Sequence, residues 1–160
     1  MLDPLSSNVH RALAIVLISA GRFDEAVEQT LKMPADNFRI PYLARARLGQ
    51  GRIAEAIQLI TARANTTKVR EQAGLLGYAY ARSGRREEAE KLAAEHSDWA
   101  NTQVLIFAGL GDKDRAFAAL DRMSVLGAPR IGMYLNYPEL ALLRGDPRLK
   151  ALRKKVGLPE

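Results

Sequence analysis

GRFDEA at residues 21–26 recurs, with changes, as GRIAEA at 51–56, GRREEA at 84–89 and GDKDRA at 111–116. Each copy stands between two stretches with the apolar spacing of a helix. Its glycine can therefore end one helix in a tight turn, and its alanine can lie where the next helix packs closely. Such self-similarity is the signature of a helix–turn–helix repeat array. A repeat array carries no built-in chemistry, so the pattern predicts a binding scaffold.

The stretches before the four glycines carry matching apolar stripes. Eight residues upstream, the position is large and apolar in three copies and polar in the last: Leu13, Leu43, Leu76 and Gln103. The next position is small in the first three copies, and an apolar or aromatic residue follows three places later in all but the second copy, which has Arg47. The i, i+4 spacing places these positions on one stripe of a helix.

These residues resemble the tetratricopeptide repeat, whose first helix carries a large apolar residue, a small one and an aromatic, and whose turn glycine precedes an alanine in the second helix. The best single match is LLGYAYARSGRREEAEKLA at residues 75–93. The resemblance covers roughly residues 7–125 and implies an all-α fold, a right-handed α–α superhelix of about four degenerate helix pairs. The glycines are 30, 33 and 27 residues apart, whereas the family repeats every 34 or so, and the packing angles can therefore differ from those of a regular superhelix.

Caps and turn residues divide this single helical domain into repeats at about 7–34, 37–65, 67–95 and 97–126, followed by a C-terminal cap at 128–160. Asp146 and Pro147 predict the start of a last helix, whose apolar edge is Leu149, Leu152 and Val156. The run PELALLRGDPRLKALRKKVGLP at 138–159 resembles the tail that closes tetratricopeptide-like regions in many bacterial signalling proteins, where it follows a winged-helix, nucleotide cyclase or protein kinase domain. The resemblance implies the C-terminal interaction or sensory part of a signalling or transcription regulator.

The residues of catalytic and metal sites do not come together in this sequence. The chain has no cysteine, and neither His10 nor His96 has the convergent ligands that a metal needs. No nucleophile elbow and no phosphate-binding glycine loop occurs. We therefore expect a protein that is not an enzyme and has no catalytic residues, no cofactor and no metal. The longest apolar run near the start, residues 12–20, is too short to cross a bilayer and lacks the flanks of a signal peptide, so we expect a cytoplasmic protein with no membrane partner.

The net charge of +6 raises the question of nucleic acid, but most basic residues alternate with Asp and Glu, which is typical of a solvated helix face. The exception is residues 144–155, where six basic residues stand against Asp146 alone. Nucleic-acid binding through this basic surface and the C-terminal helix is the alternative function. The balancing acids and the lack of aromatic–basic interleaving argue against it.

The favoured partner is a protein or peptide of acidic character. In arrays of this kind the first helix of each pair lines the concave side, and counting from the core leucines places five candidate binding residues at exposed inner positions: Arg11, Arg45, Tyr78, Arg82 and Asn101. Guanidinium groups bind carboxylates or phosphates through paired hydrogen bonds. The sequence therefore predicts a basic concave wall that binds an acidic segment, and it does not define the oligomeric state.

Overall fold

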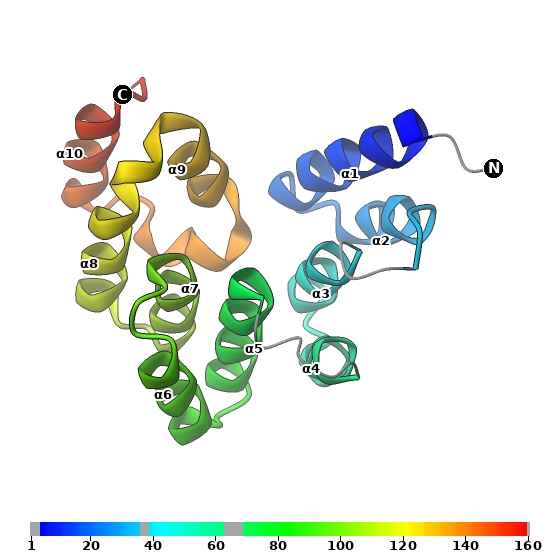
Figure 1. The fold of residues 1–160 in the computed structure, drawn as a ribbon, viewed down its shortest axis with the longest axis horizontal. Helices are drawn as coiled ribbons and strands as arrows, with labels where there is room; N and C mark the ends of the chain where they lie inside the picture. Colours follow the sequence, from blue (N-terminus) through cyan, green and yellow to red (C-terminus); the bar gives the residue numbers. More distant parts are fainter. Residues whose placement is uncertain (1–3, 36–38, 63–68, 160) are drawn as a thin grey trace.

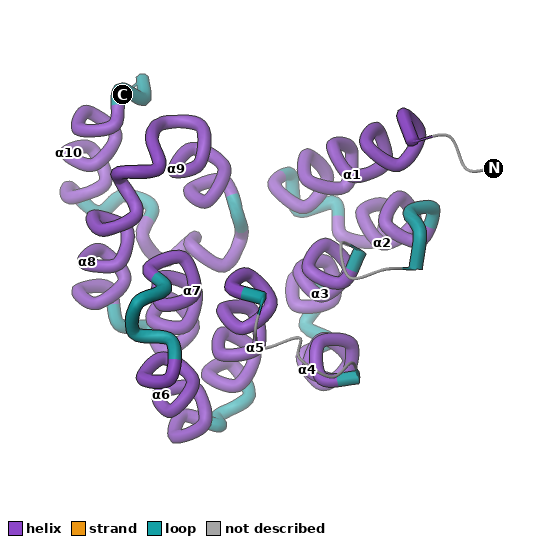
Figure 2. Tube along the Cα trace, viewed as in Figure 1, coloured by secondary structure: helices purple, strands orange, loops and turns teal. Residues whose placement is uncertain are grey.

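The computed structural model describes residues 4–35, 39–62 and 69–159, and every regular element within these ranges is helical (Figure 1, Figure 2). The first eight helices are α1 (Pro4–Ser19), α2 (Phe23–Leu31), α3 (Ile40–Gly49), α4 (Ile53–Thr61), α5 (Arg70–Arg82), α6 (Arg86–Glu95), α7 (Ala100–Leu110) and α8 (Lys113–Met123). They are followed by η2 (Ser124–Leu126), α9 (Gly127–Asn136), η3 (Pro138–Leu143) and α10 (Pro147–Val156). The all-α fold predicted from the sequence is confirmed in these ranges.

Four short turns join the first eight helices into pairs. Gly21, Gly51, Gly84 and Gly111 lie in these turns with φ between 73° and 84°, a backbone conformation that glycine adopts without strain. The alanine that follows each glycine in the repeated hexapeptide is fully buried in all four copies. The helices of each pair pack against each other, and each pair contacts the next along the chain. The local prediction of helix, turn and close-packed second helix is confirmed.

Helices α5 and α7 approach each other closely because glycines face the contact. A Cβ atom on Gly77 would lie 2.4 Å from Cγ1 of Ile106, and one on Gly109 would lie 2.9 Å from the Cα atom of Tyr78. Neither contact leaves room for a methyl group. The backbones of α5 and α7 therefore pack at a distance that only glycine permits.

The C-terminal residues form more than a cap on the last pair. In Figure 1, α1 to α8 follow an arc, and α9 and η3 lie on its inner side. Helix α10 packs on α9 and η2, with Leu152 buried and with Leu149 and Val156 half-buried against the core, as the predicted apolar edge requires. Asp146 caps α10 by accepting a hydrogen bond from the backbone N–H of Arg148, and its bonds to Arg148 lower the pKa of Asp146 to about 2.

We predict that Gly77→Ala lowers the free energy of unfolding by about 1–3 kcal/mol, because the added methyl group overlaps Ile106 in a packed core. The matched control is Gly132→Ala in α9, where the nearest atom to the new Cβ is the Cδ2 atom of Leu158 at 3.4 Å. The control should be neutral or slightly stabilising, since alanine favours the helix. Urea unfolding followed by circular dichroism measures both, and equal values for the two variants would contradict the close approach of α5 and α7.

Candidate functional site on the inner face

The five residues predicted to line a concave wall do not form one exposed surface. Arg11 and Arg82 are exposed, and Tyr78 and Asn101 are half-buried. Arg45 is only 1% exposed. The expectation that Arg45 faces solvent on the inner wall is therefore wrong, because residues 134–143 fold back over it. We call residues 134–143 the inner segment.

The side chain of Arg45 joins three elements that are distant in sequence. Its Nη1 donates a hydrogen bond of 2.6 Å to Oε2 of Glu139 in η3, and its Nη2 donates one of 3.0 Å to Oε1 of Glu71 in α5. The guanidinium also lies over the ring of Tyr137, with Cζ 3.6 Å from the ring centroid. Arg45 itself belongs to α3, so this contact ties α3 and α5 to the C-terminal residues.

Two carboxylates keep the buried guanidinium charged. Burial alone would lower the pKa of Arg45, but the negative charges of Glu139 and Glu71 outweigh it, and the pKa is raised. Glu139 is itself buried, whereas Glu71 is partly exposed. The Nε atom of Arg45 has no hydrogen-bond acceptor among the described residues. The cluster is thus a buried ion pair with a second, half-exposed carboxylate at its edge.

The inner segment fills the concave side with its own side chains. Tyr134, Tyr137, Leu140 and Leu143 are all buried, and the two tyrosine rings meet edge to face with centroids 5.8 Å apart. Burial raises the pKa of both tyrosines. Asn101, predicted to contact a ligand, is half-buried and lowers the pKa of Tyr134. The chain itself therefore covers the inner face beside α7 and around Arg45.

Sequence reasoning missed Tyr134, Tyr137 and Glu139, although a signal for the inner segment exists. Tyr134, Tyr137, Leu140 and Leu143 are spaced three residues apart. In a 3₁₀-helix, residues at i and i+3 lie on the same side, and η3 is a 3₁₀-helix. Of the four residues, Leu140 and Leu143 lie in η3, and their spacing of three indicates a buried 3₁₀ turn there, whereas Tyr134 belongs to α9.

Beside the inner segment, three residues from different helices form what we call the rim: Arg11 of α1, Tyr42 of α3 and Arg130 of α9. Burial and then the charge of Glu71 raise the pKa of Tyr42, whereas Arg11, Arg45 and Arg130 lower it. Arg11 and Arg130 are therefore close enough to act on one half-buried tyrosine. Both are exposed, and neither has an ion-pair partner among the described residues.

Two other predicted residues, Tyr78 and Arg82, both belong to α5. Burial and the charge of Glu139 raise the pKa of Tyr78, and the charge of Arg82 lowers it. Arg82 is exposed at the end of α5. Of the five predicted residues, the structure thus leaves Arg11 and Arg82 available to a partner and gives Tyr78 a half-buried place between Arg82 and the inner segment.

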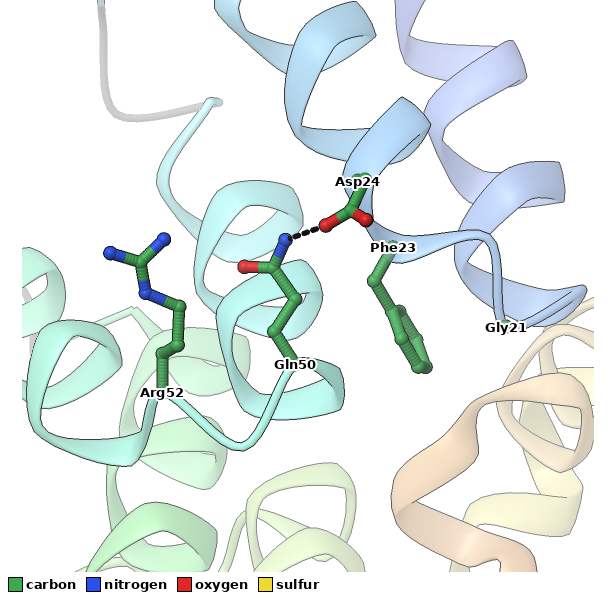
Figure 3. Close-up of a pocket in the computed structure, with 5 residues that line it drawn as sticks. All are labelled: Gly21, Phe23, Asp24, Gln50 and Arg52. Atoms are coloured by element: carbon green, nitrogen blue, oxygen red, sulfur yellow. Dashed lines mark hydrogen bonds between the residues drawn. The ribbon is translucent and has the colours of Figure 1, made fainter.

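A hollow of about 420 Å³ lies on the turn edge of the first two pairs, away from the rim (Figure 3). Its polar groups already have partners: Nε2 of Gln50 donates a hydrogen bond of 2.5 Å to Oδ1 of Asp24, and Arg52 binds Glu55. The ring of Phe23 packs on Gly49, where a Cβ atom would lie 2.3 Å from Cε1 of Phe23. This hollow therefore follows from ordinary packing between neighbouring turns.

Two basic side chains of the C-terminal helix, those of Arg148 and Lys155, are paired with carboxylates. Arg148 donates hydrogen bonds to Asp146 and Asp114, and Nζ of Lys155 donates one of 2.5 Å to Oδ1 of Asp121. Nε of Arg153 donates to the carbonyl oxygen of Pro159. These contacts weaken the case for α10 as a nucleic-acid surface, because charges that are paired in the fold attract phosphates less.

Two other features are absent from the described residues. No group of three or more His, Cys, Asp or Glu side chains there could hold a metal ion. No helix in the same ranges is long and apolar enough to cross a membrane. No protein-family model, no curated protein and no solved structure matches the chain.

We predict that Glu139→Gln lowers the free energy of unfolding by about 3 kcal/mol, near the lower end for breaking a buried ion pair, because Glu71 still compensates the charge of Arg45. The matched control is Glu25→Gln, which removes a carboxylate from the exposed pair with Arg22 and should change stability little. Urea unfolding measures both variants. Similar small losses would show that the Arg45–Glu139 contact does not hold the inner segment in place.

Proposed function

We propose that the protein is a protein-interaction scaffold that binds an acidic segment of a partner at the rim. The observation that carries the proposal is that Arg11 and Arg130, two exposed arginines without ion-pair partners in the described part of the chain, both lower the pKa of half-buried Tyr42. The two arginines come from α1 and α9, so two elements far apart in the sequence act on the same tyrosine.

The rim has the chemistry to bind a carboxylate-bearing chain. Each guanidinium presents a planar set of N–H donors that fits a carboxylate through two parallel hydrogen bonds. The half-buried ring of Tyr42, whose pKa both arginines lower, offers apolar area and a hydroxyl group. Outside the rim, Arg82 near Tyr78 on α5 offers a second contact to a partner segment that is long enough to extend beyond the rim. These groups bind and orient a chain, and they do not form a nucleophile–base pair, so we propose no enzymatic activity and no cofactor.

The wider setting is part of the same proposal. The turn glycines and the close-packed alanines support a tetratricopeptide-like array with a right-handed superhelical arrangement. The tail at 138–159, which resembles the end of such regions in bacterial signalling proteins, supports a place in a signalling or transcription regulator. Nucleic acid is the weaker candidate, since Arg148 and Lys155 of α10 are already bonded to aspartates.

The proposal predicts that Arg11→Ala combined with Arg130→Ala weakens binding of a fluorescein-labelled decaglutamate peptide at least tenfold, because hydrogen bonds to charged groups contribute about 1.5–3 kcal/mol each. Fluorescence anisotropy at low salt measures the affinity, which should also fall as salt rises. The matched control, Arg22→Ala combined with Arg52→Ala, removes the same charge from exposed ion pairs elsewhere and should leave binding nearly unchanged.

Equal weakening in the two double variants would mean that the peptide responds to net charge alone, and the rim proposal would fail. Loss of single-stranded DNA binding on replacing Lys150, Arg153 and Lys154 by alanine, with peptide binding absent from the wild type, would instead favour the nucleic-acid function. We expect the variants to keep the fold, because the replaced arginines of the rim are exposed. Circular dichroism and thermal melting check this for each variant.

A further inference from the structure

Residues 137–143 connect α9 to α10 and contact the array as a bound peptide would (orange in Figure 1). We call them the strap. Glu139 accepts a hydrogen bond of 2.6 Å from Nη1 of Arg45, and the ring of Tyr137 lies under the same guanidinium. The described backbone hydrogen bonds of the strap are local, such as the one from the N–H of Leu140 to the carbonyl oxygen of Tyr137. The hydrogen bonds that hold the strap on the array therefore run through side chains.

The helices on either side of the strap have contacts of their own. Helix α9 packs on η2 and α8, and α10 packs on α9 and η2. Two ion pairs also join α10 to α8. At the two ends of the strap, Tyr137 and Arg144 have extended backbone, and Asn136 and Arg144 are exposed. The strap can therefore move away from the array while α9 and α10 stay on α8.

The strap leaves part of the binding capacity of Arg45 unused. Glu139 pairs with Nη1 and Glu71 pairs with Nη2, whereas Nε has no acceptor among the described residues, although the side chain is buried. A buried donor without a partner costs free energy. A planar guanidinium can donate through Nε and Nη together to one carboxylate. A segment that brings one more acceptor would thus satisfy a donor that the strap does not.

We propose that the strap is a tethered ligand that closes a peptide site centred on Arg45, and that a partner segment of the same chemistry replaces it. The strap itself defines that chemistry: an aromatic residue over the guanidinium, a glutamate two places later, and a leucine directly after the glutamate. The positive charge of the guanidinium favours both the aromatic ring and the carboxylate. This site is distinct from the rim, which is exposed while the strap is in place.

Tethering explains how the site stays closed in the isolated protein. A segment held on a short linker acts at an effective concentration on the order of millimolar, so a free segment of equal fit competes poorly. A partner replaces the strap when it supplies the acceptor that Nε of Arg45 lacks, or when other contacts raise its local concentration. The strap therefore selects against weak ligands and against segments without the glutamate.

Weakening the strap should open the site to the same sequence added from outside. The probe is a fluorescein-labelled peptide with the sequence of residues 134–143, and fluorescence anisotropy measures its affinity for the full chain. Glu139→Gln should bind this probe about tenfold or more tightly than the wild type does, because the glutamate of the probe restores the ion pair with Arg45. A probe with glutamine in place of its glutamate should lose that gain. The matched control, Glu25→Gln, alters an exposed ion pair elsewhere and should bind the probe as the wild type does.

Hydrogen exchange tests the proposal on the wild type, without a substitution. The backbone N–H groups of Leu140 and Arg144 donate to carbonyl oxygens of the strap, and they should exchange through an opening that leaves α5 and α7 folded. Unlabelled peptide at about 1 mM should lower their protection factors about twofold or more, because a ligand of the open form raises its population. The protection factors of α7 should not change.

Either of two results would overturn the proposal. One is a folded Glu139→Gln variant that binds the probe no more tightly than the wild type does. The other is protection at Leu140 and Arg144 that the peptide does not change, which would make the strap a permanent part of the core. If Glu139→Gln does not fold, the exchange measurement decides alone. Decaglutamate binding by the wild type tests the rim separately, so failure of the strap proposal and failure of the proposed function are distinguishable.

Discussion

A charge that folding removes from water must be paired, and in this protein that requirement falls on Arg45. Its guanidinium is almost fully buried, and its two carboxylate partners come from α5 and from η3. The ion pair can form only when residues 134–143 lie on the inner side of the array. The position of the inner segment, and with it the part of the inner face that stays open, therefore depends on this one interaction.

The same contact changes how the array holds together. In a simple repeat protein each unit touches only its neighbours, and stability is close to a sum of local contributions. Here Arg45 and Glu139 are 94 residues apart, and Tyr137 lies under the same guanidinium. The C-terminal residues thus connect the second helix pair to the end of the chain. Arg130 on α9 lies near enough to lower the pKa of Tyr42, and α9 leads directly into residues 134–143, so the rim depends on the position of the same C-terminal residues.

Local rules predicted the local features of the fold. The turn glycines, the buried alanines and the apolar edge of α10 each follow from a short stretch of sequence and a known preference of the backbone. Arg45 was misjudged because repeat alignment compares each unit with the others and assumes that all inner positions meet solvent. The contacts that bury Arg45 come partly from a segment outside the repeats, and no pattern within the repeats reveals them.

The two surfaces that the fold leaves open differ in chemistry, and α1 contributes to both. Arg11 and Leu13 are two positions apart, so their side chains point about 200° away from each other around the helix. The charged side faces Tyr42, and the apolar side is the face that later helices cover with a preceding pair. Because the two faces do not overlap, a change on the apolar side of α1 leaves the charged side, and with it the rim, intact.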